Sequence, residues 1–163
     1  MAVLLITVVA ASSVLFVWPA SDKPQQVNAI LSLNGSDEAA REAKAIMLAK
    51  AGFAPVLLFS QGNYRTTQCP KVTGVVVVCF EPRPARTVGE VEFAARYARA
   101  RDWHSLLIVP GRAQTTRARL LMERCFTGRV VVVPASVPLL HLPIDVLYEW
   151  GALAKALLID RRC

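Results

Sequence analysis

The sequence has few of the residues from which metal sites and catalytic triads are built. Its two histidines, His104 and His141, lie far along the chain from the four cysteines, and no two cysteines have the C-x-x-C spacing. This pattern argues against a zinc site. Neither histidine has a recognisable nucleophile partner, and Ser60 lies in "FSQGN" rather than in a G-x-S-x-G turn. A serine or cysteine hydrolase is therefore not expected.

Phosphate-binding fingerprints and nucleic-acid motifs are also missing. The chain has no G-x-G-x-x-G segment and no P-loop, so no nucleotide-binding fingerprint is present. Its 19 lysines and arginines outnumber 12 aspartates and glutamates, for a net charge of +7, but the arginines are scattered rather than gathered in a tail. Nucleic-acid binding is not expected from charge without a reader motif. The same charge suits an anionic lipid or a wall polymer.

The first 20 residues carry no charge, and residues 2–18 are apolar apart from Thr7, Ser12 and Ser13. Their length is near the lower limit for a membrane-spanning helix, about 17 to 25 residues, and long for the core of a signal peptide, about 7 to 15. Cleavage after Ala20 would place Trp18 where a small residue is required. Trp18 is instead typical of an interfacial anchor.

We therefore predict an uncleaved membrane anchor over residues 1–20, which contacts lipid through residues 2–18. A linker follows at residues 21–26, and a folded domain occupies residues 27–163. The alternative is a helix buried in the core, but the segment is apolar all round rather than along one stripe, which favours lipid.

Five short runs rich in Val, Ile and Leu alternate with helical segments: "VNAILSL", "PVLLF", "GVVVVCF", "SLLIVP" and "RVVVVP". Such runs are typical of strands buried on both faces of a parallel sheet. The alternation predicts a Rossmann-like three-layer α/β domain with about five mainly parallel strands, preceded by an N-terminal hydrophobic helix. The connection "SQGNYRTTQCPKVT" has no helical period and is barely long enough for a parallel crossover.

The helices have recognisable ends. The first is predicted to begin at Ser36 and to end near Gly52. The second begins at Thr87, which is predicted to form a capping box with Glu90. The predicted apolar stripe of the first helix comprises Ala39, Ala40, Ala43, Ile46, Met47 and Lys50.

Four turns are expected at the carboxyl ends of the strands, where ligands gather in open parallel sheets: "LNGSDE", "FSQGNY", "FEPRPARTVGE" and "PGRAQTTR". Gly35 and Gly62 allow backbone amides to approach a ligand, and Ser36 and Thr87 begin helices whose free N–H groups can hold an anion. Ordinary turn chemistry explains each glycine singly, but their convergence on one edge favours a binding site.

Arg117 is predicted to point inward from the helix that follows Gly111. Residues at spacings of three and four share its stripe: Gln114, Arg117, Ala118, Leu121 and Cys125. A buried arginine requires an anionic partner. Two alternatives stay open, an internal partner, for which Glu81 and Glu90 are nearest by topology, or a bound phosphate or carboxylate.

The candidate ligand-binding residues are therefore Gly35, Ser36, Arg41, Ser60, Gly62, Glu81, Thr87, Glu90, Gly111, Gln114 and Arg117. For Arg41, in the first turns of its helix, a solvated position is expected. Outside the cytoplasm one disulfide is expected among Cys69, Cys79 and Cys125, with Cys163 mobile at the terminus; inside, all four cysteines would be small apolar residues.

Several of these segments together resemble a known family. They are "AILSLNGSDEAAREAKAIMLAKAG", the Ser60–Gly62 turn, Thr87 with Glu90, "SLLIVPGRAQTTRAR" and Glu149–Trp150. In this order they resemble the bacterial YdcF/SanA/ElyC family, a domain of unknown function with a Rossmann-like fold, and short actinobacterial members most of all. Gln114 stands where the family usually has a histidine, which argues against acid–base chemistry and leaves mainly anion-binding residues.

The resemblance implies envelope and peptidoglycan maintenance for anchored members and S-adenosylmethionine binding for a cytosolic one. We expect a plasma-membrane protein whose domain lies outside the cytoplasm and binds an anionic small molecule or a cell-wall precursor. One alternative is a cytosol-facing protein that binds a nucleotide or S-adenosylmethionine, although "SQGN" replaces the acidic ribose-binding residue after strand two. The other is a non-catalytic scaffold with a vestigial pocket.

Overall fold

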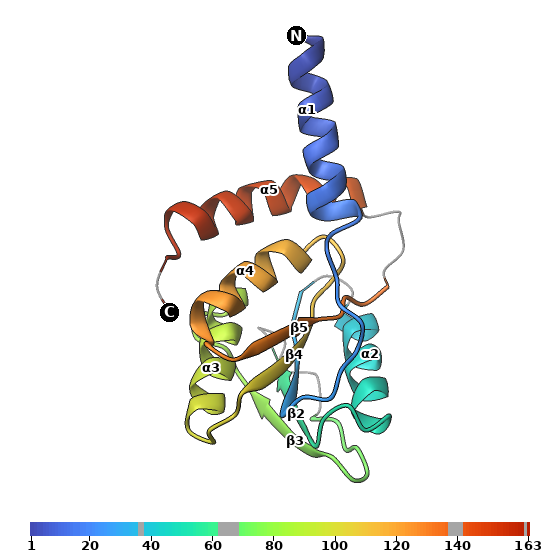
Figure 1. The fold of residues 1–163 in the computed structure, drawn as a ribbon, viewed down its shortest axis with the longest axis vertical. Helices are drawn as coiled ribbons and strands as arrows, with labels where there is room; N and C mark the ends of the chain where they lie inside the picture. Colours follow the sequence, from blue (N-terminus) through green and yellow to red (C-terminus); the bar gives the residue numbers. More distant parts are fainter. Residues whose placement is uncertain (36–37, 62–68, 137–141, 162) are drawn as a thin grey trace.

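A parallel sheet of five strands forms the centre of the structure, in the order β3-β2-β1-β4-β5 (Figure 1). The computed structural model describes residues 1–35, 38–61, 69–136, 142–161 and 163. The strands are β1 (Ala29–Ser32), β2 (Val56–Ser60), β3 (Val76–Phe80), β4 (Ser105–Val109) and β5 (Arg129–Val132). They lie within the five predicted apolar runs, except that β2 extends one residue beyond its run, and all pair in parallel. The predicted α/β fold with a five-stranded parallel sheet is therefore confirmed and is consistent with a Rossmann-like arrangement.

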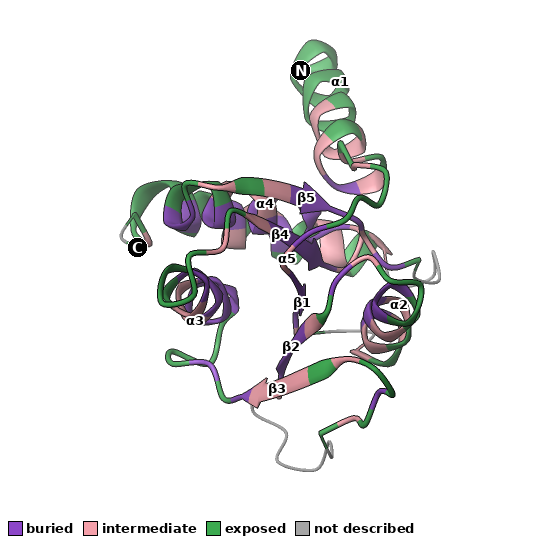
Figure 2. Cartoon of the chain, turned by 60° about the horizontal axis from the view of Figure 1, so that its bottom comes forward, coloured by how far each residue is buried: buried purple, intermediate pink, exposed green. Residues whose placement is uncertain are grey.

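Helices cover both faces of the sheet. Helix α2 (Glu38–Lys50) lies on one face, and α3 (Thr87–Arg99) and α4 (Thr115–Cys125) lie on the other (Figure 2). Helix α5 (Leu142–Leu158) lies outside these layers, across α4 (Figure 1). Gly52, with φ +82°, follows α2 as predicted.

The core follows from the pleat of the central strands. Successive residues of β1 are all buried and point to opposite faces, because side chains alternate along a strand. Leu31 packs in the cluster with residues of α3 and α4, whereas Ile30 packs with Ala45 and Leu48 of α2. Strand β3, at the edge of the sheet, is only partly buried.

The doubtful connection between β2 and β3 does join two parallel neighbours. Phe59 of β2 is in register with Cys79 of β3. Residues 62–68 of this connection lie outside the described residues. Beyond them, Cys69 is bonded to Cys79, with a Cα–Cα distance of 5.9 Å, which ties the returning chain to the edge strand.

The N-terminal segment differs from the predicted membrane-spanning helix. It consists of α1 (Ala2–Ser12) and a π-helical segment, η1 (Ser13–Val17). Among the described residues, no helix reaches the length and apolar character needed to cross a membrane. The helical part ends at Val17, and Phe16 is fully buried against Ala113 and Leu153, so the last turn belongs to the folded domain.

The predicted linker at residues 21–26 is bonded to the domain along part of its length. The backbone N–H of Asp22 donates to the carbonyl of Val132 at 2.8 Å, and the Asp22 carboxylate accepts from Val132 N–H at 2.8 Å. The same carboxylate accepts a hydrogen bond from Arg119 of α4 at 2.8 Å. The segment that leads out of α1 is thus attached to β5 and α4.

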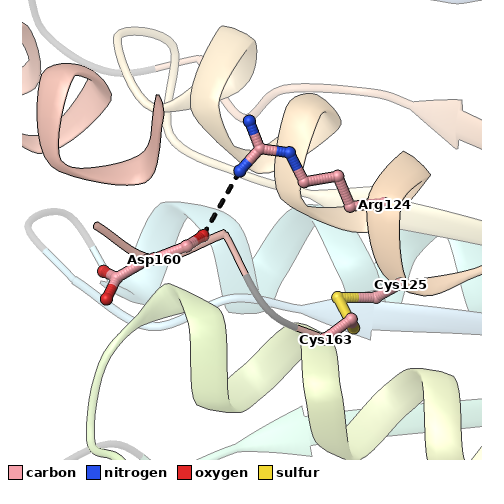
Figure 3. Close-up of a disulfide and its surroundings, with 4 residues drawn as sticks. All are labelled: Arg124, Cys125, Asp160 and Cys163. Carbon is pink, nitrogen blue, oxygen red and sulfur yellow. Dashed lines mark hydrogen bonds between the residues drawn. A yellow bond between two sulfur atoms is a disulfide. The ribbon is translucent and has the colours of Figure 1, made fainter. Parts of the chain in front are cut away.

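Two disulfides are present, and the second corrects the expectation that Cys163 is mobile. Cys163 is bonded to Cys125 at the end of α4, with a Cα–Cα distance of 5.0 Å (Figure 3). Beside this bond, Arg124 Nη1 donates to the carbonyls of Ala156 at 2.6 Å and Asp160 at 3.2 Å. The guanidinium binds carbonyl groups at the end of α5, so the C-terminus is held against α4.

Candidate functional site

A cavity of about 780 Å³ lies beyond the carboxyl ends of β1 and β4. These two neighbouring strands are where the order of the sheet reverses, since the chain proceeds from β1 to β2 and β3 on one side and from β4 to β5 on the other. The helices that follow β1 and β4 cover opposite faces, and a crevice therefore opens between the two loops. The cavity therefore lies at the edge of the sheet where the ligand site was predicted.

The walls of the cavity come from four parts of the fold. The turns after β1 and β4 contribute Gly35 and Gly111, the first turn of α3 contributes Thr87, and α4 contributes Arg117. Helix α5 forms a further wall that sequence analysis did not anticipate, including Tyr148.

Arg41 forms the floor of the cavity, where a solvated position was expected. Its side chain is 1% exposed, and Nη1 donates to the Leu33 carbonyl and to Gln114 Oε1, both at 3.2 Å. The expectation was wrong because the apolar stripe of α2 was misplaced. The residues of α2 that face the sheet are Arg41, Ala45, Leu48 and Ala49, which also have helical spacing.

Gly35 is needed for the packing of Arg41. A Cβ atom at Gly35 would lie 2.9 Å from Arg41 Nη2 and 3.0 Å from Nη1, closer than real contacts allow. The backbone at Gly35 also has φ +141°, which L-residues rarely adopt. This glycine therefore makes room for an internal guanidinium, whereas the sequence suggested that it makes room for a ligand.

Gln114 connects three elements at the base of the cavity. Its Oε1 accepts from Arg41 Nη1 and from the Gly111 N–H at 3.3 Å, and its Nε2 donates to Thr87 Oγ1 at 2.8 Å. The predicted capping box is therefore wrong. No side-chain hydrogen bond caps the start of α3, and the Thr87 hydroxyl instead accepts a hydrogen bond from Gln114, just before α4. A side-chain amide whose oxygen and nitrogen are both hydrogen-bonded holds its neighbours in position, and it does not act as an acid or a base because it does not titrate.

Glu90 is, like Glu149, a buried carboxyl that lines the cavity, and it is 2% exposed. Its Oε1 accepts from the Asn34 N–H at 2.7 Å. Burial raises the pKa of Glu90 above its usual range, and the nearby Ser60 hydroxyl, the Asn34 N–H and the charges of Arg41 and Arg117 oppose that rise. Glu90 is thus hydrogen-bonded to the turn after β1 and lies in the field of the two buried arginines.

Arg117 points inward as predicted, but its partner is neither Glu81 nor Glu90. Its Nε and Nη2 donate to the two carboxylate oxygens of Glu149 in α5, both at 2.7 Å. Burial tends to lower the pKa of Arg117, but the hydrogen bonds and charge of Glu149 more than reverse this, so the pKa is raised. The internal ion pair, one of the two alternatives, is therefore present, and Glu81 is exposed and outside the cavity wall.

Three cations that line the cavity were not identified from the sequence: Arg86, Arg112 and Lys155. Arg86 lies 3.7 Å from the Asp160 carboxylate. Arg112, in the turn after β4, and Lys155, on α5, have no carboxylate partner within the part of the chain that the structure describes. Arg112 was present in the quoted "PGRAQTTR" turn, whereas Lys155 reaches the cavity only because α5 lies across α4. These two side chains are available to an anion.

The predicted residues therefore divide into three groups. Gly35, Arg41, Thr87, Glu90, Gly111, Gln114 and Arg117 line the cavity. Ser60 is buried behind it, beside Glu90, and Glu81 is exposed away from it. Ser36 and Gly62 lie outside the described residues.

Comparison with known proteins adds no relative: no protein-family model, curated protein or solved structure matches this chain.

The Arg117–Glu149 pair can be tested by a double-mutant cycle. Replacing Arg117 by Met, or Glu149 by Leu, leaves an unpaired buried charge, and each change should lower the free energy of unfolding by about 3 to 5 kcal/mol. The double variant should regain most of this loss, since neither charge remains. Chemical denaturation measures all three differences. Additive losses in the double variant would show that the two groups do not interact.

Proposed function

We propose that this protein binds an anionic small molecule, such as a phosphorylated cell-wall precursor, in the cavity beyond β1 and β4. The observation that carries this proposal is the pair of available cations that line the cavity from two different elements, Arg112 in the turn after β4 and Lys155 on α5. The buried arginines are already bonded to protein groups, so they set the shape of the site, and the two available cations recognise the ligand.

The surrounding backbone favours the same class of ligand. Helices α3 and α4 both begin at the cavity, where Thr87 and Val88 of α3 and Gln114 before α4 line its wall. The start of a helix carries a partial positive charge. A volume of about 780 Å³ falls in the usual range for small-molecule sites, about 300 to 1,000 Å³. The resemblance to the YdcF/SanA/ElyC family supports a cell-wall precursor.

We propose no reaction for this site. Gln114 occupies the position of the family's usual histidine, and its amide is bonded to Arg41 and Thr87. A second candidate function is a non-catalytic scaffold, favoured by the pairing of Arg117 with Glu149 inside the fold. The two candidates differ in whether an anion binds at Arg112 and Lys155.

We further propose that the domain lies outside the cytoplasm and is attached to the plasma membrane through α1. Two features support this location. All four cysteines are paired in two disulfides, and disulfides form and persist in oxidising compartments. Large apolar side chains of α1, among them Val3, Leu4, Leu5 and Ile6, are between 67% and 78% exposed, which suits lipid better than water.

Anion binding is tested with inorganic pyrophosphate as the probe, titrated calorimetrically at low salt. Replacing Arg112 and Lys155 together by Gln should raise the dissociation constant at least tenfold, because the two available cations of the cavity are lost. The matched control is Lys50→Gln with Arg99→Gln, which removes the same charge at exposed ends of α2 and α3. An equal loss in both pairs would indicate attraction to overall charge, and no binding by the wild type would favour the scaffold.

The location is tested by trapping thiols in intact cells with an alkylating reagent before lysis. We expect mass spectrometry to recover Cys69 linked to Cys79 and Cys125 linked to Cys163, because an oxidising compartment preserves both bonds. In the control Cys163→Ser, Cys125 alone should become alkylated. Recovery of the wild-type chain with all its cysteines alkylated would contradict an extracytoplasmic domain.

A further inference from the structure

The outer face of α5 is apolar although it faces solvent. Its exposed large side chains outside the cavity wall, with the residue after the helix, are Leu147, Leu157, Leu158 and Ile159, whereas the exposed Ile144 and Tyr148 line the cavity. The inner face of α5, by contrast, is buried against the domain through Glu149, Leu153 and Ala156. A helix with apolar groups on its solvent side has an uncovered surface, which in a soluble domain marks an interaction site.

Helix α1 projects from the same end of the molecule. In Figure 1, α5 lies across the top of the domain and α1 extends beyond it, away from the sheet. Phe16 of η1 packs against Trp150 of α5 at a ring-centroid distance of 5.3 Å. Trp150 Nε1 donates to Ser12 Oγ at 2.9 Å. These contacts fix the direction of α1 relative to the outer face of α5.

Charge around this face favours an anionic partner. The carboxylates of Glu149 and Asp160 face the guanidinium groups of Arg117 and Arg86, at 2.7 Å and 3.7 Å. Lys155 of α5 and Arg161 just beyond it are exposed, and the whole chain carries a net charge of +7. Apolar groups flanked by basic ones are typical of helices that lie in the interface of an anionic membrane.

We propose that the outer face of α5, centred on Leu147 and Leu158, lies flat on an anionic lipid bilayer into which α1 inserts. A protein partner on α5 would leave the exposed apolar side chains around α1 uncovered. A bilayer covers both surfaces at once, because α5 packs on α4 and α1 extends past α5 on the side away from α4 (Figure 1). This inference rests on the membrane attachment of the proposed function and is independent of ligand binding in the cavity.

The test measures partition of the full-length protein onto vesicles by flotation. The vesicles contain phosphatidylcholine and phosphatidylglycerol at a ratio of about 7 to 3, with pure phosphatidylcholine as comparison. Replacing Leu147 and Leu158 together by Glu should lower the partition coefficient at least tenfold. Two apolar side chains that would be buried in the lipid are then replaced by negative charges, which an anionic bilayer repels. Both positions are exposed, 77% and 68%, so the fold should be retained, which circular dichroism checks.

The matched control is Met47→Glu with Val76→Glu, which makes the same charge change at exposed positions of α2 and β3. Its partition should stay within twofold of the wild type. Equal partition of the two double variants would overturn the inference. So would loss of self-association in lipid-free solution with unchanged partition, because a second copy would then be the occupant of α5. If the wild type does not bind vesicles at all, the proposed attachment through α1 fails as well.

Discussion

Arg117 and Glu149 connect α4 to α5, and the cavity depends on this connection. Within the part of the chain that the structure describes, α5 packs mainly on α4 and η1, so its position depends on what holds it to these elements. The two hydrogen bonds of 2.7 Å join its middle to α4, the Cys125–Cys163 bond holds the chain beyond its end, and the Phe16–Trp150 contact adds the N-terminal segment. The buried ion pair is thus the central attachment of a helix that forms both a wall of the cavity and the outer face proposed to contact lipid.

A second buried arginine organises the floor of the cavity. Arg41 passes beneath the turn after β1, and its guanidinium explains why a glycine stands at position 35 and an amide at position 114. The buried Glu90 carboxyl lies in the electric field of both Arg41 and Arg117, so the base of the cavity holds charged groups of both signs. We propose that an anion is recognised by Arg112 and Lys155, which line the cavity outside this base.

The sequence predicted those features that depend on local pattern. Continuous apolar runs predicted all five strands, and helical spacing predicted that Arg117 points inward. The partner of Arg117 was not predictable in this way, because Glu149 belongs to α5, whose placement across α4 depends on tertiary contacts. The stripe of α2 was misassigned because alanine is compatible with both faces of a helix, so Arg41 was wrongly expected in solvent. The pairing of Cys163 likewise depends on where the chain returns after α5.

The most direct test of the central claim is amide hydrogen exchange over residues 142–158, compared between the wild type and Glu149→Gln. The variant keeps the size of the side chain but removes the charge that holds Arg117. We predict at least tenfold faster exchange in α5, with unchanged exchange in β1 and β4, because the helix opens locally while the sheet stays folded. Equal exchange of α5 in the two proteins would contradict the claim that this ion pair holds the wall of the cavity.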